Sequence, residues 1–150
     1  MQEIERKFLV NKLPDGLDLV PSKFLAAGYF KDVDGKTTRI RQEGNKYFMV
    51  NKSGKGLAKD IGSGDIEIAK EEFDCLWPKT EGWRIFKTRF YISYWVYTFE
   101  FDVYRDFPDF YSVEVEFQSV GDAKKFAPPN WFGKELTDDN RYSNKNLARY

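Results

Sequence analysis

Six of the segments predicted to be β-strands in this 150-residue chain carry two charged residues of the same sign, separated by one uncharged residue. The pairs are Glu3/Glu5, Arg39/Arg41, Asp65/Glu67, Lys87/Arg89, Glu100/Asp102 and Glu114/Glu116. On a β-strand each pair lies on one face, about 6.6 Å apart. Like charges at that separation repel by about 0.6 kcal/mol in water and about 2.5 kcal/mol at an effective dielectric constant near 20. A sheet face that meets water would mix the signs, because opposite charges stabilise it. We therefore expect each pair to face a ligand.

The residue inventory narrows the kind of ligand. The chain has one cysteine, Cys75, which excludes an internal disulfide and multi-cysteine zinc sites. It has no histidine, which excludes histidine-ligated metals and Ser-His or Cys-His nucleophiles. Carboxylate pairs suit hard divalent cations, Mg²⁺ or Mn²⁺, which prefer oxygen ligands. Lysine and arginine pairs suit phosphate oxygens. With the additional cations Lys7 and Lys52, the pattern favours a polyphosphate and a divalent metal bound together in a polar channel.

The overall charge and hydropathy argue against nucleic acid and membranes as partners. The 24 basic and 24 acidic residues balance, so no general attraction to nucleic acid or to an anionic membrane is expected. No apolar run approaches the ~20 residues that span a bilayer, and no signal-peptide pattern precedes the charged start. We expect one cytoplasmic domain over residues 1–150, with Cys75 as a buried filler.

Periodicity and turn residues predict a β-dominated α+β fold, as an antiparallel barrel or a strongly curved sheet. The hairpin signals Asp34-Gly35 and Gly44-Asn45 predict a three-stranded meander, and 54–64 is expected to be a flexible loop. Helices are expected over 70–78, 121–126 and 137–148, with a short one within 17–27. Outward apolar residues, such as Ile4, Ile40, Ile66 and Phe101, should be covered by helices or a partner subunit. Strands are expected near 2–10, 28–32, 37–42, 46–52, 64–69, 84–92, 95–104 and 110–118.

The charged motifs, taken in chain order, resemble those of one known family. The opening EIERKFLV resembles the Glu-x-Glu-x-Lys signature of the CYTH superfamily, the triphosphate tunnel metalloenzymes. TTRIR, VNK, DIE, KTRFYI, FEFDVY and SVEVEF follow in the family's order, and WFGKELTDDNRYSNKNLA resembles its ending. The sequence departs from the family at Val50-Asn51, where Thr-Ile is usual, and at Asp65, where glutamate is more common.

The resemblance implies an eight-stranded antiparallel β-tunnel with a few surrounding helices, and a role for each charged residue. The implied metal ligands are Glu3, Glu5, Asp102, Glu114 and Glu116. The implied triphosphate-binding residues are Lys7, Arg39, Arg41, Lys52, Lys87 and Arg89. Asp65, Glu67 and Glu100 are implied to position cations, a second metal or the attacking water. Catalysis is expected from Glu5, Glu67 and Lys7, with Glu5 or Glu67 orienting or deprotonating the water.

The implied reaction is hydrolysis of a triphosphate, inorganic or nucleoside, with Mg²⁺ or Mn²⁺, as in the short bacterial inorganic triphosphatases that the chain resembles. The runner-up is a class IV adenylate cyclase, which needs a pocket for the base. A thiamine triphosphatase would need an aromatic platform, but Trp83, Trp95 and Trp131 are expected to pack in the core. A module that binds triphosphates without cleaving them also remains open, as does a homodimer. Arg6 is expected to face outward, and Lys145 to lie on a helix surface.

Overall fold

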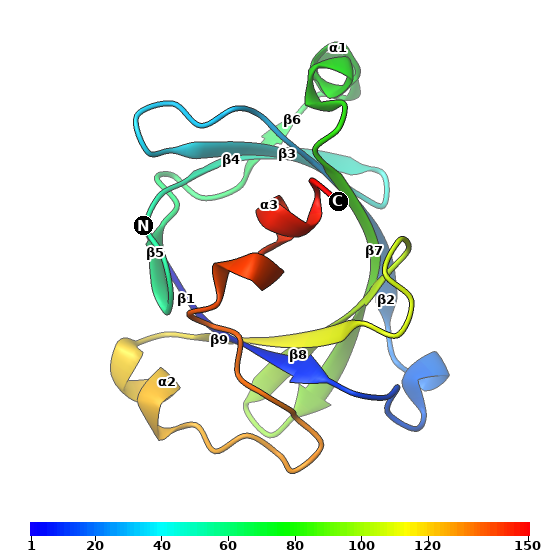
Figure 1. Cartoon of the computed structure of the whole chain (residues 1–150), viewed down its shortest axis with the longest axis vertical. Coiled ribbons are helices and arrows are strands. Elements are labelled where there is room, and N and C mark those ends of the chain that lie inside the picture. The colour runs from blue at the N-terminus through cyan, green and yellow to red at the C-terminus, as the bar shows by residue number, and fades with distance from the viewer.

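The computed structural model describes residues 1–150, and it is dominated by β-structure (Figure 1). Its strands are β1 (Gln2–Val10), β2 (Ser22–Tyr29), β3 (Thr37–Glu43), β4 (Lys46–Lys52), β5 (Ala58–Asp60), β6 (Ile66–Ile68), β7 (Arg84–Tyr94), β8 (Tyr97–Tyr104) and β9 (Tyr111–Phe117). Its helices are η1 (Leu17–Leu19), α1 (Lys70–Leu76), η2 (Trp77–Thr80), α2 (Val120–Lys125), η3 (Asn140–Tyr142) and α3 (Asn144–Leu147). None of these helices is long and apolar enough to cross a membrane.

All nine strands form one antiparallel sheet in the order β5-β1-β9-β8-β7-β2-β3-β4-β6. The sheet curls into a ring around a central space (Figure 1). Near its two edges, Ser53 and Asp60 exchange backbone hydrogen bonds of 2.9 and 3.0 Å in an isolated bridge. The predicted antiparallel β-tunnel is confirmed, with nine strands in place of eight. The extra strand, β5, lies inside the segment that was expected to be a loop.

Strand β2 begins six residues before the predicted strand 28–32, and it occupies part of the segment predicted to be helical. Residues 25–29 are buried one after another, so they show no alternation of apolar and polar side chains. A Cβ atom on Gly28 would lie only 2.4 Å from Oγ1 of Thr80, which is itself fully buried. Small residues are therefore needed where β2 passes under η2, and they weaken the strand signal.

The largest apolar cluster lies on the outer face of β1, β8 and β9, against α2 and the segment after it. Its buried members are Phe8, Val10, Phe99, Phe101, Val113, Val115, Phe126 and Phe132. Of the outward residues expected to be covered, Ile40 and Phe101 are fully buried. Ile66 is 52% exposed, because it lies on the edge strand β6. The expectation that Ile66 is covered is wrong for this chain.

The C-terminal segment enters the ring in place of a continuous helix over 137–148 (Figure 1). The backbone of β1 holds its start, since Leu136 N donates to Lys7 O over 2.7 Å. Its end packs inside the ring, where Leu147 and Ala148 join a buried cluster with Ala27, Tyr29, Ile85 and Tyr104. This end of the central space is therefore covered by the chain's own C-terminus.

Candidate active site

The ring encloses a cavity of about 720 Å³, lined by 34 residues of which only six are hydrophobic. The alternation of the strands explains this polarity. Inward positions carry the charged pairs, and the residues between them, such as Ile40 and Phe101, face the outer apolar layer. The predicted channel of converging charges is present in the structure. Cavity-lining residues from the predicted set are Glu3, Glu5, Lys7, Arg39, Arg41, Lys52, Asp65, Lys87, Arg89, Glu100, Glu114 and Glu116.

Strand register brings the acidic side chains together. Residues that face each other across an antiparallel pair point to the same side of the sheet. Glu5 of β1 faces Glu116 of β9, and Glu114 faces Glu100 of β8. Glu3, Glu5 and Glu116 each offer a carboxylate oxygen, and these oxygens lie within 4.8 Å of one another. We call these three residues the acidic triad.

The acidic triad fits a hard divalent cation. It offers oxygen ligands alone, which is the donor set that Mg²⁺ and Mn²⁺ prefer. Burial raises the pKa of Glu5 well above its usual value, and the charges of Glu114 and Glu3 raise it further. Burial and the charge of Glu3 also raise the pKa of Glu116. Both shifts show carboxylates short of compensating positive charge, which a bound cation would supply.

Asp102 and Glu114 differ from the acidic triad because cationic side chains of the protein compensate their charges. Asp102 is fully buried and accepts from Lys87 Nζ at 2.8 Å and from Arg89 Nε and Nη2 at 2.8 and 2.9 Å. It does not line the cavity, so it holds the two cations from behind. Although burial favours the neutral acid, the charges of Arg89 and Lys7 lower the pKa of Glu114 well below its usual value.

Arg89 also pairs with Glu100, so this carboxylate is the second acidic group beside the guanidinium. Burial raises the pKa of Glu100 to about 7, against the charge of Arg89 and with the help of Glu114. Burial and the charge of Arg89 lower the pKa of Lys87 to about 8. This wall of the cavity is therefore a packed network of opposite charges on β7, β8 and β9.

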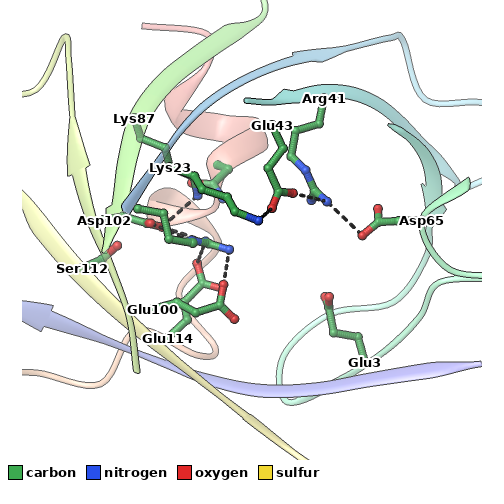
Figure 2. A network of polar contacts seen from close by, with 12 residues as sticks. Glu3, Lys23, Arg41, Glu43, Asp65, Lys87, Glu100, Asp102, Ser112 and Glu114 are labelled. Carbon is green, nitrogen blue, oxygen red and sulfur yellow. Dashed lines mark hydrogen bonds and ion pairs between the residues drawn. The ribbon is translucent and has the colours of Figure 1, made fainter. Parts of the chain in front are cut away.

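The wall formed by β3 carries the two arginines. Arg39 Nη2 and Arg41 Nη2 lie 3.4 and 3.1 Å from the carboxylate of Asp65, and Arg41 also lies 3.3 Å from Glu43. Figure 2 shows Arg41, Glu43 and Asp65 together, across the cavity from Glu100 and Glu114. The Nε atoms of Arg39 and Arg41 are buried and have no hydrogen-bond partner. The two guanidinium groups line the cavity, so their other N–H groups can donate to an anion bound there.

Lysines complete the basic lining. Lys52 Nζ donates to Glu3 Oε1 over 2.9 Å, and Lys7 Nζ donates to the carbonyl oxygen of Tyr142 over 2.7 Å. Burial lowers the pKa of Lys7, although nearby carboxylates oppose the shift. The C-terminal segment thereby supplies a partner to a cation of the opening motif, 135 residues away in the sequence.

Several sequence-based expectations for single residues do not hold. Glu67 is exposed on the edge strand β6 and is not among the residues that line the cavity. Cys75 is exposed on α1, where only Phe73 of that helix is buried, so it is not a core filler. Lys145 lines the cavity and pairs with Asp32, because the C-terminal segment turns inward.

None of the four tryptophans lines the cavity. Trp83 and Trp131 pack against the apolar clusters, as expected, whereas Trp95 is 88% exposed at the turn between β7 and β8. Arg6 faces away from the cavity, as expected, and pairs with Glu135.

Sequence reasoning missed Lys59, Glu43 and Tyr29, all of which line the cavity. Lys59 lies on β5 within a segment that has no strand periodicity, and Tyr29 lies on the misplaced strand β2. Glu43 lies two residues after Arg41 on β3, so it shares a face with Arg39 and Arg41. The alternation of side chains alone would therefore have predicted that Glu43 faces the cavity.

Comparisons with known proteins place the chain among triphosphatases. An inorganic triphosphatase from Nitrosomonas europaea is 45% identical to it over 152 residues, covering 99% of this chain and 97% of the relative. A crystal structure of an inorganic triphosphatase superposes with a TM-score of 0.70 at 42% identity, covering 99% and 95% of the two chains. A protein of Pyrococcus horikoshii shares the fold, with a TM-score of 0.61 at 19% identity and 82% and 84% coverage. No protein-family model matches the chain.

Proposed function

Because the chain belongs to the CYTH superfamily of triphosphate tunnel metalloenzymes, we propose that it hydrolyses inorganic triphosphate inside its charged tunnel. One observation carries the proposal: an open acidic triad and a set of arginines and lysines line the same cavity of about 720 Å³. A metal-bound triphosphate presents both kinds of charge and satisfies both sets of residues at once.

Glu3, Glu5 and Glu116 would hold Mg²⁺ or Mn²⁺, with Glu114 beside them and Asp102 behind Lys87 and Arg89. The metal, when bound, supplies Lewis-acid neutralisation of phosphate charge. Phosphoryl transfer then depends mainly on positioning and on electrostatic stabilisation by the chain's own cations. Those cations are Lys7, Arg39, Arg41, Lys52, Lys87 and Arg89, all of which line the cavity.

Glu5 is the carboxylate that we assign to orienting the attacking water. Of the two residues considered for this role, Glu5 lines the cavity and Glu67 does not. Asp65 and Glu100 are assigned to holding Arg39, Arg41 and Arg89 in place.

Inorganic triphosphate is favoured over substrates that carry a ring. Adenylate cyclase chemistry needs a pocket for adenine, and thiamine triphosphate needs a stacking platform. None of the four tryptophans lines the cavity, so no tryptophan offers that platform; the tyrosines Tyr29 and Tyr91 do line it, and the assay below therefore includes thiamine triphosphate.

One assay tests the function and its competitors together. The protein is incubated with triphosphate, pyrophosphate, ATP or thiamine triphosphate, each with Mg²⁺ or Mn²⁺, and orthophosphate, pyrophosphate and cyclic AMP are measured. We expect orthophosphate from inorganic triphosphate, at a rate that a chelator abolishes. Cyclic AMP with pyrophosphate would instead identify a cyclase, and binding without any product would identify a non-catalytic module.

A further inference from the structure

Lys59 is a cation of the cavity whose function is not explained by the motifs of the sequence. It lies on β5 directly opposite Glu3 of β1, so the two side chains share a face. The Lys59 side chain lines the cavity and is 28% exposed. It therefore reaches the space beside the acidic triad.

The ammonium group of Lys59 is only loosely engaged. Its Nζ atom lies 3.9 Å from Oε1 of Glu5, which is beyond hydrogen-bonding distance. Lys52, by contrast, donates a hydrogen bond of 2.9 Å to Oε1 of Glu3. Two ammonium groups thus lie against two of the three carboxylates that form the acidic triad.

The fold does not need the Lys59 side chain to hold β5 in place. Backbone pairing with β1 and the Ser53–Asp60 bridge position the strand. The backbone N–H of Glu5 also donates to Leu57 O over 3.1 Å. A neutral side chain at position 59 should therefore leave the tunnel intact, which makes the charge of Lys59 available for ligand binding.

We propose that Lys59 binds phosphate oxygens of the substrate and couples the binding of the anion to that of the metal. In the absence of an anion its positive charge weakens the binding of a divalent cation to the acidic triad. When triphosphate is present, the same charge is neutralised by the anion. The inference rests on the proposed function, because it takes the metal and the triphosphate as the two ligands of the cavity.

Electrostatics set the direction of both effects. A divalent cation on Glu5 would lie beside the same carboxylate as the Lys59 ammonium. The two positive charges would repel each other strongly, because burial at Glu5 weakens screening by solvent. Lysine has a long flexible stem and three donors, so it can turn from Glu5 to a phosphate oxygen. By linkage, an anion that draws the ammonium away strengthens the binding of the metal, and the metal strengthens the binding of the anion.

The test uses the full chain and two separate titrations, and calorimetry measures the binding affinity in each. Mn²⁺ alone is titrated into the unmodified protein and into Lys59→Gln, and tripolyphosphate alone is titrated into both in the presence of a chelator. We expect Lys59→Gln to bind Mn²⁺ about tenfold more tightly and tripolyphosphate about tenfold more weakly. Lys125→Gln, at an exposed lysine on α2, is the matched control and should change neither constant.

Opposite shifts in the two affinities support the inference, because a general loss of structure would weaken both. An unchanged affinity for either ligand, or a shift of both in the same direction, overturns it. Glu116→Gln separates this result from the proposed function. If Mn²⁺ binding does not depend on Glu116, the proposed metal site fails; if it depends on Glu116 but not on Lys59, only the role of Lys59 fails.

Discussion

At the scale of single residues, the candidate metal ligands are the carboxylates that face the cavity without a full set of cationic partners. Glu3, Glu5 and Glu116 converge without a full set of cationic partners, whereas both oxygens of Asp102 are occupied by Lys87 and Arg89. The sequence shows all of these residues as members of similar charged pairs. Only their partners in space distinguish a candidate metal ligand from an anchor.

We predict that Glu116→Gln abolishes metal-dependent turnover while leaving the fold intact. Glutamine keeps the shape of the side chain and removes the charge of one triad carboxylate, so we expect activity on triphosphate to fall by at least about 100-fold. Phosphate release measures the activity, and circular dichroism checks the fold. Glu71→Gln, in the first turn of α1, is the control and should retain activity. Equal activity of the two variants would remove the acidic triad from the mechanism.

At the scale of elements, the outer contacts of β1 and β2 hold the tunnel wall in shape. Arg6 donates to both oxygens of Glu135 at 2.9 and 2.7 Å, and its remaining nitrogen bonds the carbonyl oxygens of Ala123 and Phe126. This one side chain therefore ties β1, α2 and the C-terminal segment together. Its outward direction follows from the alternation along β1.

The Arg6–Glu135 pair gives a pH-dependent prediction. Hydrogen bonding from Arg6 lowers the pKa of Glu135 below its ordinary value of 4.5. The stabilisation is thus fully present above pH 4.5 and is lost as the pH falls through the lower pKa of the folded protein. We expect Glu135→Gln to reduce the free energy of unfolding by about 1 kcal/mol at pH 7, a value kept small by solvent screening. The difference should shrink at pH 3 in urea unfolding experiments, and an equal difference at both pH values would contradict this account.

Close packing between β2 and η2 predicts a strong effect of a single methyl group. A Cβ on Gly28 would lie 2.4 Å from Oγ1 and 2.7 Å from Cβ of Thr80. We expect Gly28→Ala to destabilise the protein by about 2 kcal/mol, because overpacking forces the strand and the helix apart. Gly121→Ala, on α2 with its nearest neighbour 3.8 Å away, is the control and should be neutral or stabilising. Similar denaturation midpoints for both variants would show that the β2–η2 contact yields easily.

At the scale of the whole molecule, the tunnel wall combines pairs of opposite charge on β7 and β8 with neighbouring like charges that repel one another, such as Arg39 and Arg41. Arg39 and Arg41 lie on one strand with unpaired buried Nε atoms, and Glu5 lies among other carboxylates. The apolar packing that stabilises the fold lies in the layer outside the ring and beneath α3. A ligand that fills the cavity should therefore stabilise the folded chain markedly.

We predict that tripolyphosphate raises the midpoint of thermal unfolding even without metal. At about 100 times its dissociation constant, a ligand adds about 2.7 kcal/mol of stability, which corresponds to roughly 5 °C or more for a chain of this size. Differential scanning fluorimetry with a chelator present measures the shift, and sulfate at equal ionic strength is the control. A shift no greater than that of sulfate would show that the cavity does not select a polyphosphate.

The resemblance to the CYTH superfamily implied the tunnel, and the sequence by itself determined the strand-borne pairs of like charge, the absence of histidine chemistry and the extended segments that carry the pairs. These features depend on neighbours one or two positions apart, such as Glu3 and Glu5, whose shared face is a local property of extended backbone. Tertiary structure decided which charges meet. Register across β1, β9 and β5 brought Glu116 and Lys59 to Glu5, and the inward path of the C-terminus brought Tyr142 to Lys7. Such contacts depend on strand order and long-range packing, which no local pattern encodes.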